Sequence, residues 1–217
     1  MPKTLQSGSV DYRSTVAEPL KPLAEQYEGK PEELQKLLHE GLKEIGKDTS
    51  NLKDVKLTYI TSGTGATDKQ RQEWWKQQLE TNLGITVDMK VYGDAMLYNQ
   101  AREAWNFDIL SDGWIGDYND PLTFLDLWTT GNGNNYSGYS NPEYDKQLKE
   151  LNNVTDEAQR LEIYKKLEQK LVAEDFAVTP TFYGDTQRFV QNYVKDFYFP
   201  TFGPVYEWRW AYIAKRS

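Results

Sequence analysis

The sequence predicts an α/β domain with a mixed β-sheet flanked by helices. Apolar and polar residues alternate in the short runs 55–60 and 85–91, which is the pattern of β-strands, and a helix-length segment separates them. A strand, a helix and a second strand in this order form a crossover with parallel strands. The chain has 217 residues, of which 38% are hydrophobic and 27% are charged, as is ordinary for a globular protein.

The first half of the chain divides at its turn and cap residues. Residues 1–30 carry three prolines and little periodicity, so we expect an extended lead-in. Pro31 then opens a helix that ends before Gly46. In order, we next expect a strand at 55–60, a turn at 61–65, a helix at 68–83 ended by Gly84, a strand at 85–91, a helix capped by Asp94 and running to 104, and a strand at 107–110.

The second half changes in character. Residues 111–140 are rich in Gly, Asn and Asp, yet they keep several Trp, Tyr and Phe residues. Helices are expected at 121–128, 142–152 and 155–175, the last with an apolar face. The final forty residues are aromatic and read as strands at 177–183, 188–190, 197–199 and 208–213.

Composition excludes several classes of function. The net charge is −8, from 25 basic and 33 acidic residues, and no basic run is present, which argues against nucleic-acid binding. No apolar stretch is long enough to span a bilayer. The chain has no cysteine, which excludes disulfides, thiolate nucleophiles and cysteine-ligated zinc. The single histidine, His39, lies on the polar side of a predicted helix, so no metal site is expected there.

The segment 112–121 is the most informative part of the sequence. It follows a predicted strand and precedes a helix, so it lies at the sheet edge where ligands bind in open α/β folds. Gly113 and Gly116 allow another backbone to approach closely. Asp117 is flanked by aromatic residues and could accept a hydrogen bond from an ammonium group. The alternative is a polar turn whose side chains bond their own backbone.

This segment resembles a signature of the solute-binding proteins of oligopeptide and dipeptide ABC importers, family 5. It reads Gly113-Trp114-Ile115-Gly116-Asp117-Tyr118-Asn119-Asp120-Pro121. Three later segments fall in the order expected for that family: the Asn-rich loop and helix start 134–145, the helix segment 159–164, and the segment 178–183. The resemblance covers about residues 31–217, and the first thirty residues match loosely.

The resemblance implies a two-lobed clamp that closes on an extended peptide. Residues 31–217 would be the C-terminal, periplasmic-binding-protein-like lobe, with the last strands, about 186–217, returning toward the N-terminal lobe. The chain looks like an excised fragment without that lobe, an export signal or a lipid-anchor cysteine. The implied partners are a peptide, an ABC permease and the N-terminal lobe. The parent protein would contact the membrane only through an anchor that is missing from this chain. The location implied is extracytoplasmic, and neither a catalytic residue nor a cofactor is expected.

The resemblance also implies a set of ligand-binding residues. Asp117 would pair with the α-ammonium group of the peptide, and the backbone at Gly113 and Ile115 would bond the peptide as an added strand. Ser111 stands where some relatives carry an arginine, which counts against recognition of a ligand carboxylate. The complete predicted set is Arg102, Gly113, Trp114, Ile115, Asp117, Tyr118, Asn119 and Tyr183.

Other functions stay open at this point. Within the family, the solute could be a metal chelate or an oligosaccharide instead of a peptide. A carbohydrate-active hydrolase needs two carboxyl groups, which Asp112, Asp117 and Asp120 could supply. A calcium site could use Asp117, Asn119 and Asp120, although no glutamate stands at the twelfth loop position. An interaction module without a small ligand would also carry exposed aromatic residues.

Overall fold

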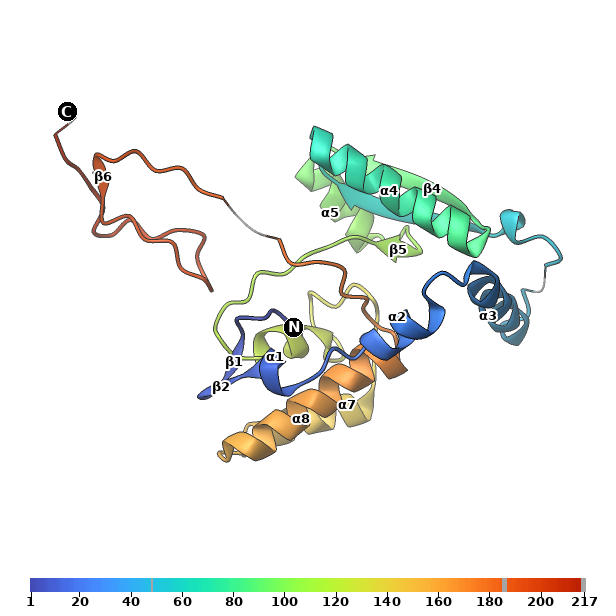
Figure 1. Cartoon of the computed structure of the whole chain (residues 1–217), viewed down its shortest axis with the longest axis horizontal. Coiled ribbons are helices and arrows are strands. Elements are labelled where there is room, and N and C mark those ends of the chain that lie inside the picture. Colours follow the sequence, from blue (N-terminus) through green and yellow to red (C-terminus); the bar gives the residue numbers. More distant parts are fainter. Residues whose placement is uncertain (48, 185–186, 216–217) are drawn as a thin grey trace. The chain divides into compact units, whose positions relative to one another are not determined.

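The computed structural model describes residues 1–47, 49–184 and 187–215 (Figure 1). The chain forms two compact units, which we describe separately. Unit 1 comprises Met1–Leu20 and Trp114–Ser217, and unit 2 comprises Lys21–Gly113. These units do not coincide with the predicted lead-in and lobe, because the division falls inside the signature segment, between Gly113 and Trp114.

Unit 2 contains a parallel three-stranded sheet in the order β4-β3-β5. Its strands are β3 (Lys56–Ser62), β4 (Thr86–Tyr92) and β5 (Ile109–Leu110). Tyr59 of β3 lies opposite Met89 of β4 and Ile109 of β5. The predicted strand–helix–strand unit with parallel strands is therefore confirmed. The sheet is wholly parallel among the described residues, so the prediction of a mixed sheet is wrong; the antiparallel pairs form separate ribbons in unit 1.

The helices of unit 2 that were predicted begin and end close to the expected residues. Gly84 ends α4 because it adopts a left-handed conformation, φ 71°, and Asp94 caps α5 by accepting hydrogen bonds from the backbone N–H groups of Met96 and Leu97. The helices are α2 (Lys21–Tyr27), α3 (Pro31–Glu44), α4 (Ala66–Leu83) and α5 (Ala95–Glu103), with a 3₁₀ turn, η1, at Leu52–Asp54.

Helices α4 and α5 cover opposite faces of the sheet (Figure 1). Successive side chains of a strand point to opposite faces. Tyr59 and Val87 are buried in a cluster that includes Trp75 of α4. Thr58 is one residue from Tyr59, and Lys90 is three residues from Val87. Because both spacings are odd, Thr58 and Lys90 lie on the other face of the sheet, beside α5. The alternating sequence pattern thus divides the sheet into a core face and a face shared with α5.

Unit 1 is built around the antiparallel helices α7 and α8, which lie side by side (Figure 1). Tyr164 and Leu167 of α8 pack against Tyr144 of α7 and Tyr12 of α1 in one buried cluster. Its elements are β1 (Gln6–Ser7), β2 (Val10–Asp11), α1 (Tyr12–Thr15), α6 (Leu122–Leu125), η2 (Asp126–Trp128), α7 (Pro142–Leu151), α8 (Glu157–Gln169), η3 (Lys170–Glu174), β6 (Val194–Lys195) and β7 (Tyr212–Ile213).

The prediction that residues 1–30 are extended is wrong. They contain the hairpin β1–β2 and the helices α1 and α2. Asp11 caps α1 by accepting from the backbone N–H of Ser14, and Tyr12 is fully buried. Pro22 does not interrupt α2, because it stands in the first turn of that helix, where its missing N–H costs nothing.

The C-terminal strands are fewer than predicted. Within the described residues, β6 pairs with β7, and Tyr198 and Glu207 form an isolated bridge. The predicted strand segments 177–183 and 188–190 form no ladder in the part of the chain that the structure describes. Residue 186 and residues 216–217, at the ends of the predicted returning segment, lie outside the described residues. A strand pattern shows which residues can pair but does not supply the neighbouring strand.

The buried phenol of Tyr144 predicts a loss of stability at high pH. Its hydroxyl donates to the Leu125 carbonyl at 2.7 Å, and burial raises the pKa of Tyr144 well above its usual value. The unfolded chain releases this proton near pH 10, whereas the folded chain keeps it. The contribution of Tyr144 to the free energy of unfolding is therefore fully present below pH 10. Above pH 10 it falls by about 1.4 kcal/mol per pH unit.

Urea unfolding at pH 8 to 11.5 would measure this slope, with Tyr144→Phe as the matched variant. Above pH 10, the free energy of unfolding of the variant should fall less steeply with pH, by about 1.4 kcal/mol per pH unit, because one fewer proton is released on unfolding. Equal slopes in both proteins would show that Tyr144 ionises in the folded state.

Candidate ligand-binding site

The first residues of the signature segment are held by α5, within unit 2. The Ser111 N–H donates to the Ile60 carbonyl at 3.0 Å and extends the pairing of β5 by one bond. The Tyr98 hydroxyl donates to the Ser111 carbonyl. The Arg102 guanidinium pairs with the Asp112 carboxylate at 2.6 Å, and the other oxygen of Asp112 accepts from the Gly113 N–H at 2.8 Å.

Arg102 thus meets a carboxylate of its own chain. Its guanidinium also donates to the Asn99 side chain at 3.1 Å and lies over the Tyr98 ring at 5.9 Å. The positive charge that was predicted to face a ligand is compensated by Asp112. A direct ligand contact by Arg102 stays a prediction, and sequence reasoning missed both Tyr98 and the pairing with Asp112.

The two signature glycines have different roles. Gly116 is buried, and its carbonyl accepts from the Gly203 N–H at 2.9 Å, both within unit 1. A methyl group at Gly116 would lie 3.0 Å from the Thr123 methyl carbon. The close backbone approach predicted at Gly116 is therefore made by Gly203 of the same chain. At Gly113, nothing among the described residues lies within 4 Å of an added Cβ, so this position has open space.

Asp117 combines an anchored backbone with an exposed side chain. Its N–H donates to the hydroxyl of the buried Thr123 at 2.9 Å. Among the described residues, no hydrogen bond or ion pair to its carboxylate is found. Burial raises the pKa of Asp126, and the negative charge of Asp117 adds to the effect. Burial and the charges of Asp126, Asp120 and Asp117 likewise raise the pKa of Tyr118. The Asp117 region therefore favours a cation.

Apolar side chains flank Asp117. The exposed fractions are 39% for Trp114, 65% for Ile115 and 43% for Tyr118, which leaves much of their apolar surface in solvent. The side-chain oxygen of Asn119 accepts from the Gln6 N–H of β1 at 2.9 Å, and a ligand contact by Asn119 stays a prediction. Tyr183 donates its hydroxyl to a backbone carbonyl at 2.6 Å, and burial raises its pKa to about 12.

The acidic residues do not form the alternative sites. Asp120 accepts from the Leu122 N–H at 2.9 Å and from the Tyr164 hydroxyl at 2.6 Å, so it links the first residue of α6 to α8. Asp112 is paired with Arg102. Two of the three carboxylates considered for a hydrolase are thus engaged by groups of the chain itself. In the described part of the chain, no group of three or more acidic or histidine side chains is arranged to hold a metal ion.

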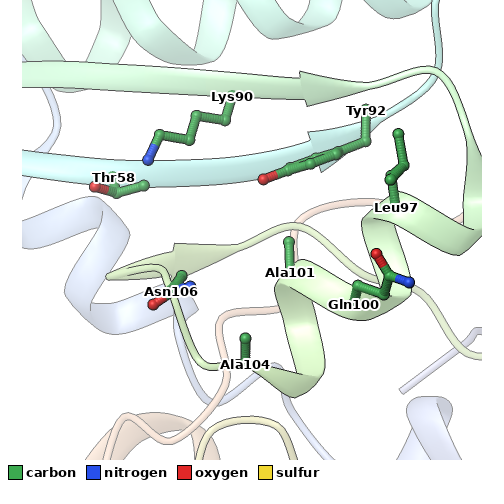
Figure 2. A pocket seen from close by; sticks show the side chains of 8 residues that line it. All are labelled: Thr58, Lys90, Tyr92, Leu97, Gln100, Ala101, Ala104 and Asn106. Carbon is green, nitrogen blue, oxygen red and sulfur yellow. The ribbon is translucent and has the colours of Figure 1, made fainter.

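A separate pocket of about 590 Å³ lies on the α5 face of the unit 2 sheet (Figure 2). Figure 2 shows the side chains of Lys90 and Tyr92 extending from β4 into the space beside α5. None of the predicted ligand residues lines this pocket. Its lining residues are Thr58, Lys90, Tyr92, Leu97, Gln100, Ala101, Ala104 and Asn106.

No helix in the ranges that the structure describes is long and apolar enough to cross a membrane.

Residues 4–136 match the model of the bacterial extracellular solute-binding proteins, family 5 Middle. The match begins at residue 4, so the expectation that the likeness starts at residue 31 is wrong. The chain is 36% identical over 172 residues to the oligopeptide-binding protein OppA of Bacillus subtilis, which covers 78% of this chain and 30% of that protein. The chain thus spans about a third or less of the length of the relatives it matches.

Two solved structures show the same fold. OppA of Haemophilus influenzae, in complex with the peptide RPPGFSPFR, has a TM-score of 0.77 at 25% identity and covers 99% of this chain and 39% of that chain. Listeria monocytogenes OppA bound to peptide has a TM-score of 0.68 at 30% identity and covers 86% of this chain and 34% of that chain. The α/β class and the periplasmic-binding-protein-like architecture are confirmed.

Proposed function

Since the chain belongs to the family 5 bacterial extracellular solute-binding proteins, we propose that it supplies part of the peptide-binding cleft of an ABC importer's binding protein. The relatives named as binding oligopeptides, dipeptides or murein peptides favour a peptide over a metal chelate or an oligosaccharide. The proposed role is binding and delivery to a permease, outside the cytoplasm, without catalysis.

The observation that carries this proposal is the Asp117 carboxylate. It is exposed, its backbone is fixed by Thr123, and the apolar side chains of Trp114, Ile115 and Tyr118 stand beside it. A peptide offers a matching pair of features at its first residue, an α-ammonium group and an apolar side chain. A charge-assisted hydrogen bond to the carboxylate would hold the ammonium group, and the rings would cover the carbon atoms next to it.

The backbone at Gly113 and Ile115 would add hydrogen bonds along the peptide. The open space at Gly113 allows a second strand to approach. Its N–H is engaged by Asp112, so a peptide carbonyl that bonds this N–H would displace the Asp112 oxygen. We place the chain in the C-terminal lobe of a two-lobed protein, in which the other wall of the cleft comes from residues beyond those present here.

Peptide titrations of two proteins test this proposal. The first is the chain itself, and the second is a chimera in which the chain replaces the matching segment of the Bacillus subtilis relative. We expect the chain alone to bind free-amino peptides more weakly than about 1 μM, because part of a cleft makes part of the contacts, and the chimera to bind them more tightly.

Calorimetry of both proteins with the same peptide library decides the outcome. Tight binding by the chain alone would contradict a divided cleft. A folded chimera that binds oligosaccharides but no peptide would replace the proposed ligand class.

A further inference from the structure

Helix α5 forms a fixed platform beside the start of the signature segment. Asp94 caps its first turn, and Tyr98 is 7% exposed, with its ring 6.1 Å from that of Tyr92 on β4. Tyr98 and Arg102 are four residues apart, so they lie on the same side of the helix. The two side chains reach successive residues of the chain, Ser111 and Asp112.

The sheet alone gives this segment little support. β5 pairs with β3 over two residues, Ile109 and Leu110, and the Ser111 N–H adds one further bond to Ile60. Beyond that point, the contacts found among the described residues come from α5 and from Asp112 itself. The direction in which the chain leaves the sheet therefore depends on the two α5 side chains.

From this geometry we propose that Tyr98 and Arg102 are positioning residues, which set the backbone of Ser111–Gly113 for an incoming peptide strand and do not bind the ligand themselves. The inference rests on the proposed peptide-binding function. The Arg102 side chain is 19% exposed, and its guanidinium forms an ion pair with the Asp112 carboxylate at an N–O distance of 2.6 Å. Arg102 therefore does not bind the ligand carboxylate, so a substitution of Arg102 should affect a peptide with a free C-terminal acid and its amide equally.

Matched peptides distinguish positioning from ligand contact in the chimera. Arg102→Met and Tyr98→Phe should each lower peptide affinity by about three- to tenfold. This factor corresponds to the free energy of one partly exposed hydrogen bond, which is charged for Arg102 and neutral for Tyr98. The loss should be the same for a free-acid peptide and its amide. A loss confined to the free-acid peptide would make Arg102 a ligand contact and overturn the proposal, as would unchanged affinity in both variants.

Amide hydrogen exchange of the 217-residue chain and its variants tests, without any ligand, whether the α5 side chains hold the backbone of Ser111–Gly113 in place. We expect Arg102→Met to speed exchange at Ser111 and Gly113 by about threefold or more, with Ile60 and Val87 unchanged. The charge swap Arg102→Asp with Asp112→Arg should return the Ser111 rate toward that of the wild type.

A matched control, Lys36→Met, removes one partner of an exposed ion pair on α3, Lys36 to Glu40 at 3.9 Å, and should change none of these rates. Equal acceleration throughout unit 2 would show a general structural role and overturn the proposal. If the chimera bound no peptide, the proposed function would fail, while the exchange rates would still decide whether α5 positions the loop.

Discussion

Replacing Asp117 by asparagine in the chimera is expected to lower the affinity for free-amino peptides by about ten- to a hundredfold. The variant keeps the shape of the side chain and one acceptor oxygen but loses the negative charge. A charge-assisted hydrogen bond in a closed cleft contributes roughly 1.5–3 kcal/mol, and about 1.4 kcal/mol corresponds to a factor of ten. The backbone bond from Asp117 to Thr123 does not involve the carboxylate and should survive the change.

The same peptides with acetylated N-termini provide the control, because they lack the ammonium charge. They should bind weakly to the unmodified chimera and lose little further affinity in Asp117→Asn. Glu150→Gln, at an exposed residue of α7, matches the change in net charge and should leave both affinities unchanged. Equal losses for free and acetylated peptides would assign Asp117 a role in the loop fold instead of the ammonium contact.

Apart from α2, the elements of unit 2 could be predicted because their determinants are local. Gly84 and Asp94 stand within a few residues of the helix ends that they define, and the alternation in β3 and β4 fixes which face each residue occupies. The short strand β5 and the extension of β3 to Ser62 show the usual uncertainty at element ends.

The failures of prediction concern contacts between distant residues. Tyr12 is buried by α7 and α8, more than a hundred residues away, so nothing in its neighbourhood indicates that the lead-in folds. Gly116 is needed for its contact with Gly203, which lies far along the chain. The C-terminal strands fail for the same reason, because pairing depends on a partner strand.

At the candidate site, too, the local features could be predicted and the contacts between distant residues could not. The exposed Asp117 and its apolar neighbours follow from a polar loop that interrupts an aromatic segment. The partner of Arg102 does not follow, since the spacing of ten residues between Arg102 and Asp112 crosses from a helix into a loop. Asn119 belonged to the predicted ligand set, yet its side chain holds β1, a contact over 113 residues of sequence.

Replacing Glu168 by glutamine is expected to destabilise unit 1 by about 3–5 kcal/mol, the cost of leaving a buried charge without its partner. Glu168 is 2% exposed and lies on α8. One carboxylate oxygen accepts from the Arg13 guanidinium at 2.5 Å and from the Met1 ammonium at 3.0 Å, and the other accepts from the Tyr12 hydroxyl at 3.0 Å. The Arg13 side chain is 9% exposed, so water cannot replace the lost carboxylate.

Hydrogen exchange of the α8 amides measures this loss for unit 1 separately from unit 2. Glu162→Gln, on the same helix but in an exposed pair with Lys165, is the matched control and should cost at most about 0.5 kcal/mol. Adding Arg13→Met to Glu168→Gln removes the charges of Glu168 and Arg13 and leaves that of the Met1 ammonium. The double variant should be less unstable than the sum of the single variants, since the second change no longer strands a charge. Strict additivity would mean that Glu168 stabilises the helix packing by its shape and not by pairing with Arg13.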